Sequence, residues 1–201
     1  MGLATFIEEE SREPATLEHV KMIKNGIYRL DQYIKNILSY SRNNRRAIEV
    51  ERISVAAKTR EVIQMLINAR HAEHINFQID INEDVAFYSD EHSFSVILQN
   101  LISNALKFHK IDQDDRYVRI IGSTSEDALN LSIEDNGIGI PKEHQTRIFD
   151  MFFRVSGAVE GSGIGLYITK EILEKLQGSI SVDSAEGQGT QFHITIKNLK
   201  P

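Results

Sequence analysis

The sequence lacks cysteine, long apolar runs and any excess of positive charge, and each absence removes a class of protein. With no cysteine in 201 residues, disulfides and thiolate metal sites are excluded, and a reducing cytoplasmic setting is expected. No apolar run approaches the roughly 18 residues of a membrane-spanning helix, so we expect no membrane contact by this chain, although a membrane-attached parent protein remains compatible. The 23 basic and 29 acidic residues disfavour a nucleic-acid partner, which selects a basic surface.

Length and apolar content indicate one or two globular domains. A hydrophobic content of 41% is enough for a substantial core in a chain of this size. The pattern changes at a basic junction that ends at Arg46. We therefore divide the chain into a helical region, residues 1–46, and a second domain, residues 47–201.

The first region predicts two helices. Residues 2–10 form the end of one helix, and Pro14 suits the start of a second that runs to about Arg46. The second helix carries apolar residues at alternating spacings of three and four: Val20, Ile23, Ile27, Leu30, Ile34 and Ile37. This is the period of a coiled-coil seam, so we expect a helical hairpin that pairs with a second chain in a homodimer. The alternative is a helix lying on the domain's own core.

The second region mixes strands and helices in an irregular order. Alternating and helical apolar patterns predict a short strand near 48–53, a helix at 55–72, a strand at 75–81 and a short returning strand at 85–88. A central helix through 100–108 follows, capped by Ser89 or Asp90. The rest of the chain predicts strands at 117–125 and 129–135 and a hairpin of 179–184 with 190–197. This order favours a mixed sheet with helices packed on one face, an α/β sandwich.

The central helix carries a polar stripe beside its apolar face. At 100° per residue, Asn100, Asn104 and Lys107 fall on one narrow strip. An amide oxygen is a hard ligand that suits Mg²⁺, and a lysine one turn later reaches phosphate as a point charge. The alternative is a solvated helix edge that happens to carry these residues.

An acidic residue ends the strand at 129–135. Strand alternation directs the carboxylate of Asp135 toward the core, where it needs a hydrogen-bond partner such as the exocyclic amine of a purine. Gly137 and Gly139 follow and allow a flat ring to approach the backbone. An Asn-Gly hairpin turn is the alternative, but Pro141 and the residues after it indicate a short helix instead of a strand.

Two further glycine segments surround the last helix. Glycines at 161–165 precede that helix and expose N–H groups that attract phosphate, although their spacing differs from the dinucleotide-binding fingerprint. The loop at 154–160 is a candidate lid, with Phe149, Phe152 and Phe153 at its base or in the core. Residues 187–190 are first of all a hairpin turn.

Four segments in this order resemble motifs of one family. The segments at 100–108, 135–139, 149–153 and 161–165 resemble the N box and the first glycine, phenylalanine and second glycine boxes of sensor histidine kinases. Residues 187–190 resemble the family's last glycine motif, and residues 36–42 resemble the second helix of its dimerisation hairpin. The resemblance covers roughly residues 48–197, and the ordered set is specific although each motif is modest alone.

The resemblance implies a Bergerat-type ATP-binding fold, preceded here by an incomplete helical hairpin, with ATP and Mg²⁺ as ligands. By analogy Asn104 coordinates Mg²⁺ with Asn100 nearby, and Asp135 accepts from the adenine amine. Lys107 and Arg154 reach the phosphates. The remaining nucleotide contacts implied by the resemblance are Phe108, Gly137, Gly139, Ile140, Phe152, Gly161, Ser162, Gly163, Ile164, Gly165, Leu166 and Thr190.

The family passes the γ-phosphoryl group of ATP to a histidine on the first hairpin helix, and then to an aspartate on a response-regulator receiver domain. The acceptor histidine is normally followed by Asp or Glu and shortly by Pro, and none of the seven histidines fits. His19 lies on the coiled-coil helix but precedes Val20. We therefore expect the chain to begin downstream of the acceptor, and to bind Mg-ATP without phosphorylating itself.

Three alternative functions share the same ATP fold or part of it. Gyrase, mismatch-repair and heat-shock ATPases place a Glu four residues before the metal-binding Asn, as a general base for water, where this chain has Asn100. A serine kinase acting on an anti-anti-sigma partner lacks the heptad helix. A nucleotide-binding module without catalysis is disfavoured by the intact Asn104, Lys107 and Asp135.

Overall fold

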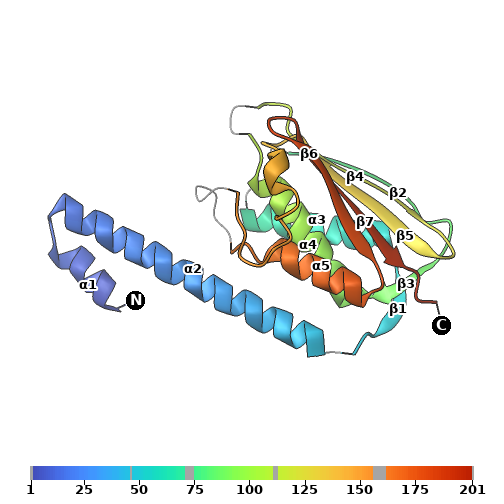
Figure 1. Cartoon of the computed structure of the whole chain (residues 1–201), viewed down its shortest axis with the longest axis horizontal. Helices are drawn as coiled ribbons and strands as arrows, with labels where there is room; N and C mark the ends of the chain where they lie inside the picture. Colours follow the sequence, from blue (N-terminus) through green and yellow to red (C-terminus); the bar gives the residue numbers. More distant parts are fainter. Residues whose placement is uncertain (1, 46, 71–74, 111–112, 156–161, 201) are drawn as a thin grey trace.

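The structure is a computed structural model that describes residues 2–45, 47–70, 75–110, 113–155 and 162–200. A long helical arm lies beside an α/β unit that holds the rest of the chain (Figure 1). No described helix is both long and apolar enough to cross a membrane. The elements are α1 (Gly2–Glu10), α2 (Pro14–Arg45), β1 (Val50–Ile53), α3 (Val55–Arg70), β2 (Asn76–Asn82), β3 (Phe87–Asp90), α4 (Glu91–Lys107), β4 (Tyr117–Thr124), β5 (Ala128–Asp135), a 3-10 turn η1 (Lys142–His144), α5 (Gly165–Lys175), β6 (Ser179–Ala185) and β7 (Gly189–Lys197).

The helical arm consists of α1 folded back against the first turns of α2 (Figure 1). Val20 is buried, whereas the next seam residues, Ile23 and Leu30, are 53% and 60% exposed. Ile27 is also exposed. Among the seam residues whose burial is described, Val20 is therefore covered and Ile23, Ile27 and Leu30 are not. Arg46, the predicted end of this helix, lies outside the described residues.

The main sheet has five strands in the order β2-β4-β5-β7-β6. Strands β2 and β4 are parallel, and every other neighbouring pair is antiparallel. Helices α3, α4 and α5 lie on one face, and the mixed sheet with helices on one side is the architecture that the sequence predicts (Figure 1). Strand β5 lies at the centre of the sheet, which brings its terminal residue Asp135 beside Thr190 of β7.

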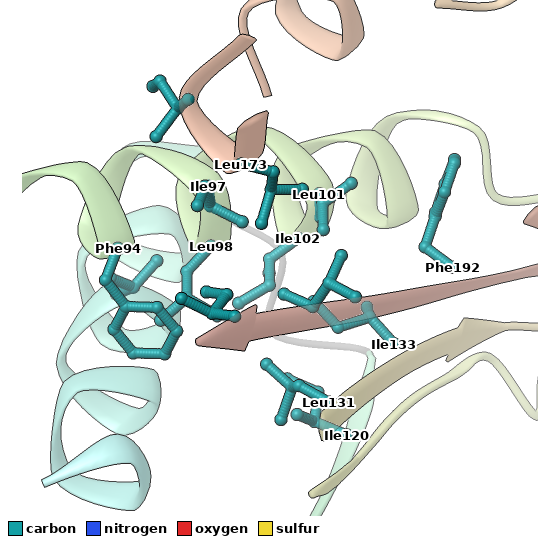
Figure 2. Packing of buried hydrophobic residues seen from close by; sticks show 14 of the residues in the cluster. Phe94, Ile97, Leu98, Leu101, Ile102, Ile120, Leu131, Ile133, Leu173 and Phe192 are labelled. Carbon is teal, nitrogen blue, oxygen red and sulfur yellow. The ribbon is translucent and has the colours of Figure 1, made fainter. Parts of the chain in front are cut away.

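The core lies between α4 and the sheet. The register aligns Ile120 of β4 with Ile133 of β5, and Ile133 with Phe192 of β7, so that one apolar row crosses three strands. Helix α4 covers this layer with a set of fully buried side chains, shown in Figure 2: Phe94, Ile97, Leu98, Leu101 and Ile102. Full burial of each such side chain contributes about 1.5–3 kcal/mol, so α4 is fixed firmly relative to the sheet.

One detail of the predicted elements is corrected, and one alternative is decided. The strand expected at 85–88 to return beside β2 is instead β3, which pairs with β1 in a separate two-stranded sheet. The cause is the burial of Phe87 beneath α4, where its ring meets that of Phe94 at 6.1 Å between centroids. Asp90 is the N-cap of α4, because its side chain accepts from the backbone N–H of Ser93 at 2.7 Å.

Candidate functional site

The polar stripe of α4 forms the centre of the candidate site. Asn100, Asn104 and Lys107 are all half-buried, and they lie next to the face that packs on the sheet. The side-chain nitrogen of Asn100 donates to the carbonyl of Gly165 at 3.2 Å and to the hydroxyl of Thr169 at 3.3 Å. Asn104 differs, because its carboxamide makes no hydrogen bond within the described residues. Its oxygen is therefore available to a ligand.

Lys107 closes the stripe at the carboxyl end of α4. Its ammonium lies 5.7 Å from the centre of the Phe108 ring. Phe108 itself ends the helix and is half-buried. The structure thus keeps a cation and an aromatic ring together, one turn beyond Asn104.

Asp135 occupies the end of β5 as the alternation predicts. One carboxylate oxygen accepts from the backbone N–H of Gly137 at 2.8 Å, and the backbone N–H of Thr190 also contributes. Burial nevertheless raises the pKa of Asp135 from 3.8 to about 6, and Glu134 adds to this increase. The two backbone hydrogen bonds therefore do not offset the cost of burying the ionised carboxylate.

The first glycine segment is held between α4 and the β6–β7 turn. The backbone N–H of Ile138 donates to the carbonyl of Phe108 at 2.9 Å, and that of Gly187 donates to the carbonyl of Ile138 at 2.7 Å. A Cβ on Gly137 would lie 2.3 Å from the Phe108 carbonyl oxygen, and one on Gly139 would lie 2.0 Å from that of Ala185. Both glycines are thus required by close backbone packing.

The phenylalanine segment supports the second glycine segment. Phe149 and Phe153 pack against the core, and the Arg147 guanidinium lies 4.4 Å from the centre of the Phe153 ring. Phe152 is 51% exposed at a positive φ of 67°, and its backbone N–H donates to the carbonyl of Gly163 at 3.0 Å. The expectation that one or more of these aromatics belong to the core is confirmed. Phe152 is the most exposed of the three.

The second glycine segment leads directly into α5. Gly163 has a φ of +69°, and a Cβ there would lie 2.8 Å from the Phe153 carbonyl oxygen. Ser162 accepts from the backbone N–H of Ile164 at 3.3 Å, while the Ile164 side chain is buried, so only its backbone can face a ligand. Leu166 is half-buried in the first turn of α5. The N–H groups in the first turn of any α-helix have no carbonyl partner within the helix, and such groups can bind phosphate.

Two further predicted positions are Gly161 and Arg154. Gly161, with most of the candidate lid at 154–160, lies outside the described residues. Arg154 is described and half-buried immediately after Phe153. Its predicted contact with phosphate stays a prediction.

Three residues of the site were missed by the sequence analysis. The Ser184 hydroxyl accepts from the backbone N–H of Ile140 at 2.8 Å and lies 3.1 Å from the buried Thr190 hydroxyl. The Gln145 side chain donates to the carbonyls of Ile140 and Ser184. Thr169, fully buried in α5, is the third. Only the register of a hairpin that pairs Ser184 with Thr190 could have indicated one of them.

A groove of about 410 Å³ lies next to this network, outside the set of predicted residues. Its lining comes from the chain after the first glycine segment and from the end of β6: Pro141, Lys142, Glu143, Gln145, Ser184, Ala185 and Glu186. It borders the backbone of Ile140 through the contacts of Gln145 and Ser184.

The separate segments meet at α4. Asn100 contacts the start of α5, and Phe108, two turns later, contacts the segment that follows Asp135. Asn104 lies on the helix between these two contacts. The structure therefore brings the central helix, the inward-facing acid and both described glycine segments to one place.

Comparisons with known proteins identify the family. Residues 89–200 match the family described as "Histidine kinase-, DNA gyrase B-, and HSP90-like ATPase". The chain is 36% identical over 136 residues to a probable C4-dicarboxylate sensor kinase of Bacillus subtilis, covering 65% of this chain and 25% of that protein. It is 30% identical over 194 residues to the signal transduction histidine-protein kinase ArlS of Staphylococcus haemolyticus, covering 92% of this chain and 42% of that protein. The chain thus spans less than half the length of both relatives.

Solved structures share the fold. Full-length ShkA in complex with AMPPNP matches with a TM-score of 0.70 at 22% identity, over 97% of this chain and 41% of that one. The nucleotide-free catalytic domain of the histidine kinase ThkA matches with a TM-score of 0.64 at 24% identity, over 75% of this chain and 98% of that one. The predicted α/β sandwich with preceding helices is confirmed. The chain belongs to the histidine kinase-, DNA gyrase B- and HSP90-like ATPase family and carries the ATP-binding catalytic core of a two-component sensor histidine kinase.

Proposed function

We propose that this chain transfers the γ-phosphoryl group of Mg-ATP to a histidine outside its own sequence, and that the phosphoryl group then passes to an aspartate of a response-regulator receiver domain. The observation that carries the proposal is the carboxamide of Asn104, which has no hydrogen-bond partner in the part of the chain that the structure describes and is flanked along α4 by the start of α5 and by the segment after Asp135. Phosphoryl transfer depends mainly on positioning and charge neutralisation, which this arrangement can supply.

The phosphate end of the site is assigned to α4 and α5. Asn104 offers Mg²⁺ one amide oxygen, and Lys107 and Arg154 offer positive charge to the phosphates. No group of three or more His, Asp or Glu side chains suited to a metal occurs among the described residues. This fits Mg²⁺, which keeps several waters and binds through phosphates with one or two protein oxygens. The bound metal neutralises phosphate charge, while the N–H groups at the start of α5 orient the phosphate chain.

The base end of the site is assigned to Asp135. Its ionised carboxylate has two backbone donors but a raised pKa, so it gains from a further donor such as the exocyclic amine of adenine. Thr190 is buried beside it. The backbone of Gly137 and Gly139, fixed by their packing, forms the adjacent surface for the ring.

Residues 1–46 are assigned to part of a dimerisation hairpin. The seam on α2 has Ile23, Ile27 and Leu30 exposed in a single chain. Apolar residues at this heptad spacing gain most by packing against a second helix of the same kind. We therefore propose a homodimer through this arm in the full-length protein, with the receiver domain as a separate partner.

Direct ATP hydrolysis is the second candidate, and Asn100 disfavours it. Hydrolytic relatives of this fold use a Glu at that position as general base for water. Here the position holds an amide, whose nitrogen is already committed to Gly165 and Thr169. Rapid steady turnover of ATP by the chain would favour hydrolysis over phosphoryl transfer to histidine.

The first prediction concerns nucleotide binding. Replacing Asp135 by Asn should weaken binding of Mg-AMPPNP about 10- to 100-fold, because a hydrogen bond to a charged group contributes about 1.5–3 kcal/mol. Isothermal titration calorimetry measures this directly. The matched control is Asp183→Asn, an exposed acid on β6 paired with His193, which should bind as the unmodified chain does. Equal affinity in Asp135→Asn and Asp183→Asn would remove Asp135 from the site.

The second prediction follows from the raised pKa of Asp135. Since the folded chain holds this proton more tightly than the unfolded chain does, the group favours folding at low pH, and that contribution is lost as pH rises through about 6. Without nucleotide, the stability of Asp135→Asn relative to the unmodified chain should therefore increase by about 2 kcal/mol between about pH 4 and pH 7.5. Urea unfolding at each pH measures it, and a pH-independent difference would contradict it.

The third prediction concerns the phosphoryl acceptor. The chain incubated with ATP and Mg²⁺ should carry no acid-labile phosphate, because none of its histidines has the family's acceptor pattern. A supplied first-helix segment with an acceptor histidine should become labelled, and the Asp135→Asn variant should fail to label it. Phosphohistidine on the chain alone would refute the proposal, and its loss in His19→Gln would identify the acceptor.

A further inference from the structure

The contact between α4 and α5 includes one polar cluster that the proposed transfer does not use directly. Asn100 donates through its side-chain nitrogen to the carbonyl of Gly165 and to the hydroxyl of Thr169. The Thr169 hydroxyl donates in turn to the same Gly165 carbonyl at 2.9 Å. Two donors therefore converge on one carbonyl in the first turn of α5.

Thr169 is fully buried in α5. A buried hydroxyl is costly unless its hydrogen bonds are made, and here both its donor and acceptor roles are filled. Packing alone would be served as well by valine, which has the same shape. The hydroxyl is thus a specific connection to Asn100.

The start of α5 has no side-chain cap at its N-cap residue, although Ser162 accepts from the backbone N–H of Ile164 and the carbonyl of Gly163 accepts from that of Phe152. Gly163, just before the N-cap, has a backbone conformation that favours glycine. Gly165 leaves room for close approach, since a Cβ there would already lie 3.4 Å from the side-chain oxygen of Asn100. Besides these local contacts, the first turn of α5 is therefore also held from outside, by the Asn100 side chain of α4.

Asn100 and Asn104 lie one turn apart on the same face of α4. Because both residues belong to one helix, any movement of α5 relative to Asn100 also moves the N–H groups of α5 relative to the Asn104 carboxamide. The buried side of α4 packs firmly on the sheet, so α4 is the rigid partner in this pair.

We propose that Thr169 and Asn100 are positioning residues that hold the first turn of α5 at a fixed place relative to Asn104, so that both address one triphosphate. The inference rests on the proposed function and deepens it. Thr169 contacts no phosphate in this scheme. It acts on the phosphate end of the nucleotide through the backbone of Gly165, and has no effect on the base end at Asp135.

The test compares Thr169→Val, which removes the hydroxyl at constant shape, with Thr169→Ser, which keeps it. Thr169→Val should weaken binding of Mg-AMPPNP about 5- to 10-fold while leaving the weaker binding of adenosine unchanged, and Thr169→Ser should restore the affinity for Mg-AMPPNP. The matched control is Thr195→Val on β7, whose hydroxyl bonds Asn130 on the exposed side of the sheet. Thr195→Val should change neither the affinity for Mg-AMPPNP nor the affinity for adenosine.

Hydrogen exchange in the chain without nucleotide gives a second, independent readout. The amide of Ile168, which donates to the carbonyl of Ile164, and the hydrogen-bonded amides of the next turn of α5 should exchange several-fold faster in Thr169→Val, whereas those of β5 should not change. Asn100→Ala should give the same increase, and the double variant should add little, because both residues act on one carbonyl.

Unchanged Mg-AMPPNP affinity in a folded Thr169→Val chain would overturn the inference, as would an equal loss for adenosine and Mg-AMPPNP. If neither the unmodified chain nor any of the variants binds nucleotide, the proposed function fails. The exchange measurement still decides whether Thr169 and Asn100 hold α5, and unchanged exchange in both variants would overturn that too.

Discussion

Two hydrogen bonds near opposite ends of the polar stripe of α4 set the geometry on which the site depends. At one end the Asn100 side chain holds the carbonyl of Gly165, and at the other the Phe108 carbonyl accepts from Ile138. The other side of α4 is buried against the sheet, which fixes the helix (Figure 2). The segments of Gly165 and Ile138 therefore cannot move relative to the sheet without breaking their hydrogen bonds to α4. The proposed phosphate end and the proposed base end of the site thus both contact one helix, and Asn104 lies between the two contacts.

Much of this was predictable, because side-chain periodicity alone decides which face a residue occupies. A period of 3.6 places Asn100, Asn104 and Lys107 together beside an apolar face, and a period of two directs Asp135 inward at the end of β5. Both expectations need only local geometry. The fold class followed from the order of the patterns, and the family from the order of the motifs.

The contacts between distant segments were not predictable in the same way. Thr169, Ser184 and Gln145 carry no local signal, since their roles depend on which backbone groups the fold brings near them. Gly137 was expected to make room for a base, but its missing side chain is already required by the carbonyl of Phe108. Strand β3 was misplaced because the burial of Phe87 under α4 outweighed its nearness in sequence to β2.

The most direct measurement is the Mg²⁺ dependence of AMPPNP affinity in Asn104→Ala, with Asn68→Ala on the exposed face of α3 as the matched control. If Asn104 supplies the protein oxygen for the metal, Mg²⁺ should tighten binding in the unmodified chain and in Asn68→Ala, and should do so far less in Asn104→Ala, while affinity without Mg²⁺ stays similar in all three. An undiminished effect of Mg²⁺ in a folded Asn104→Ala chain would contradict the central role of α4.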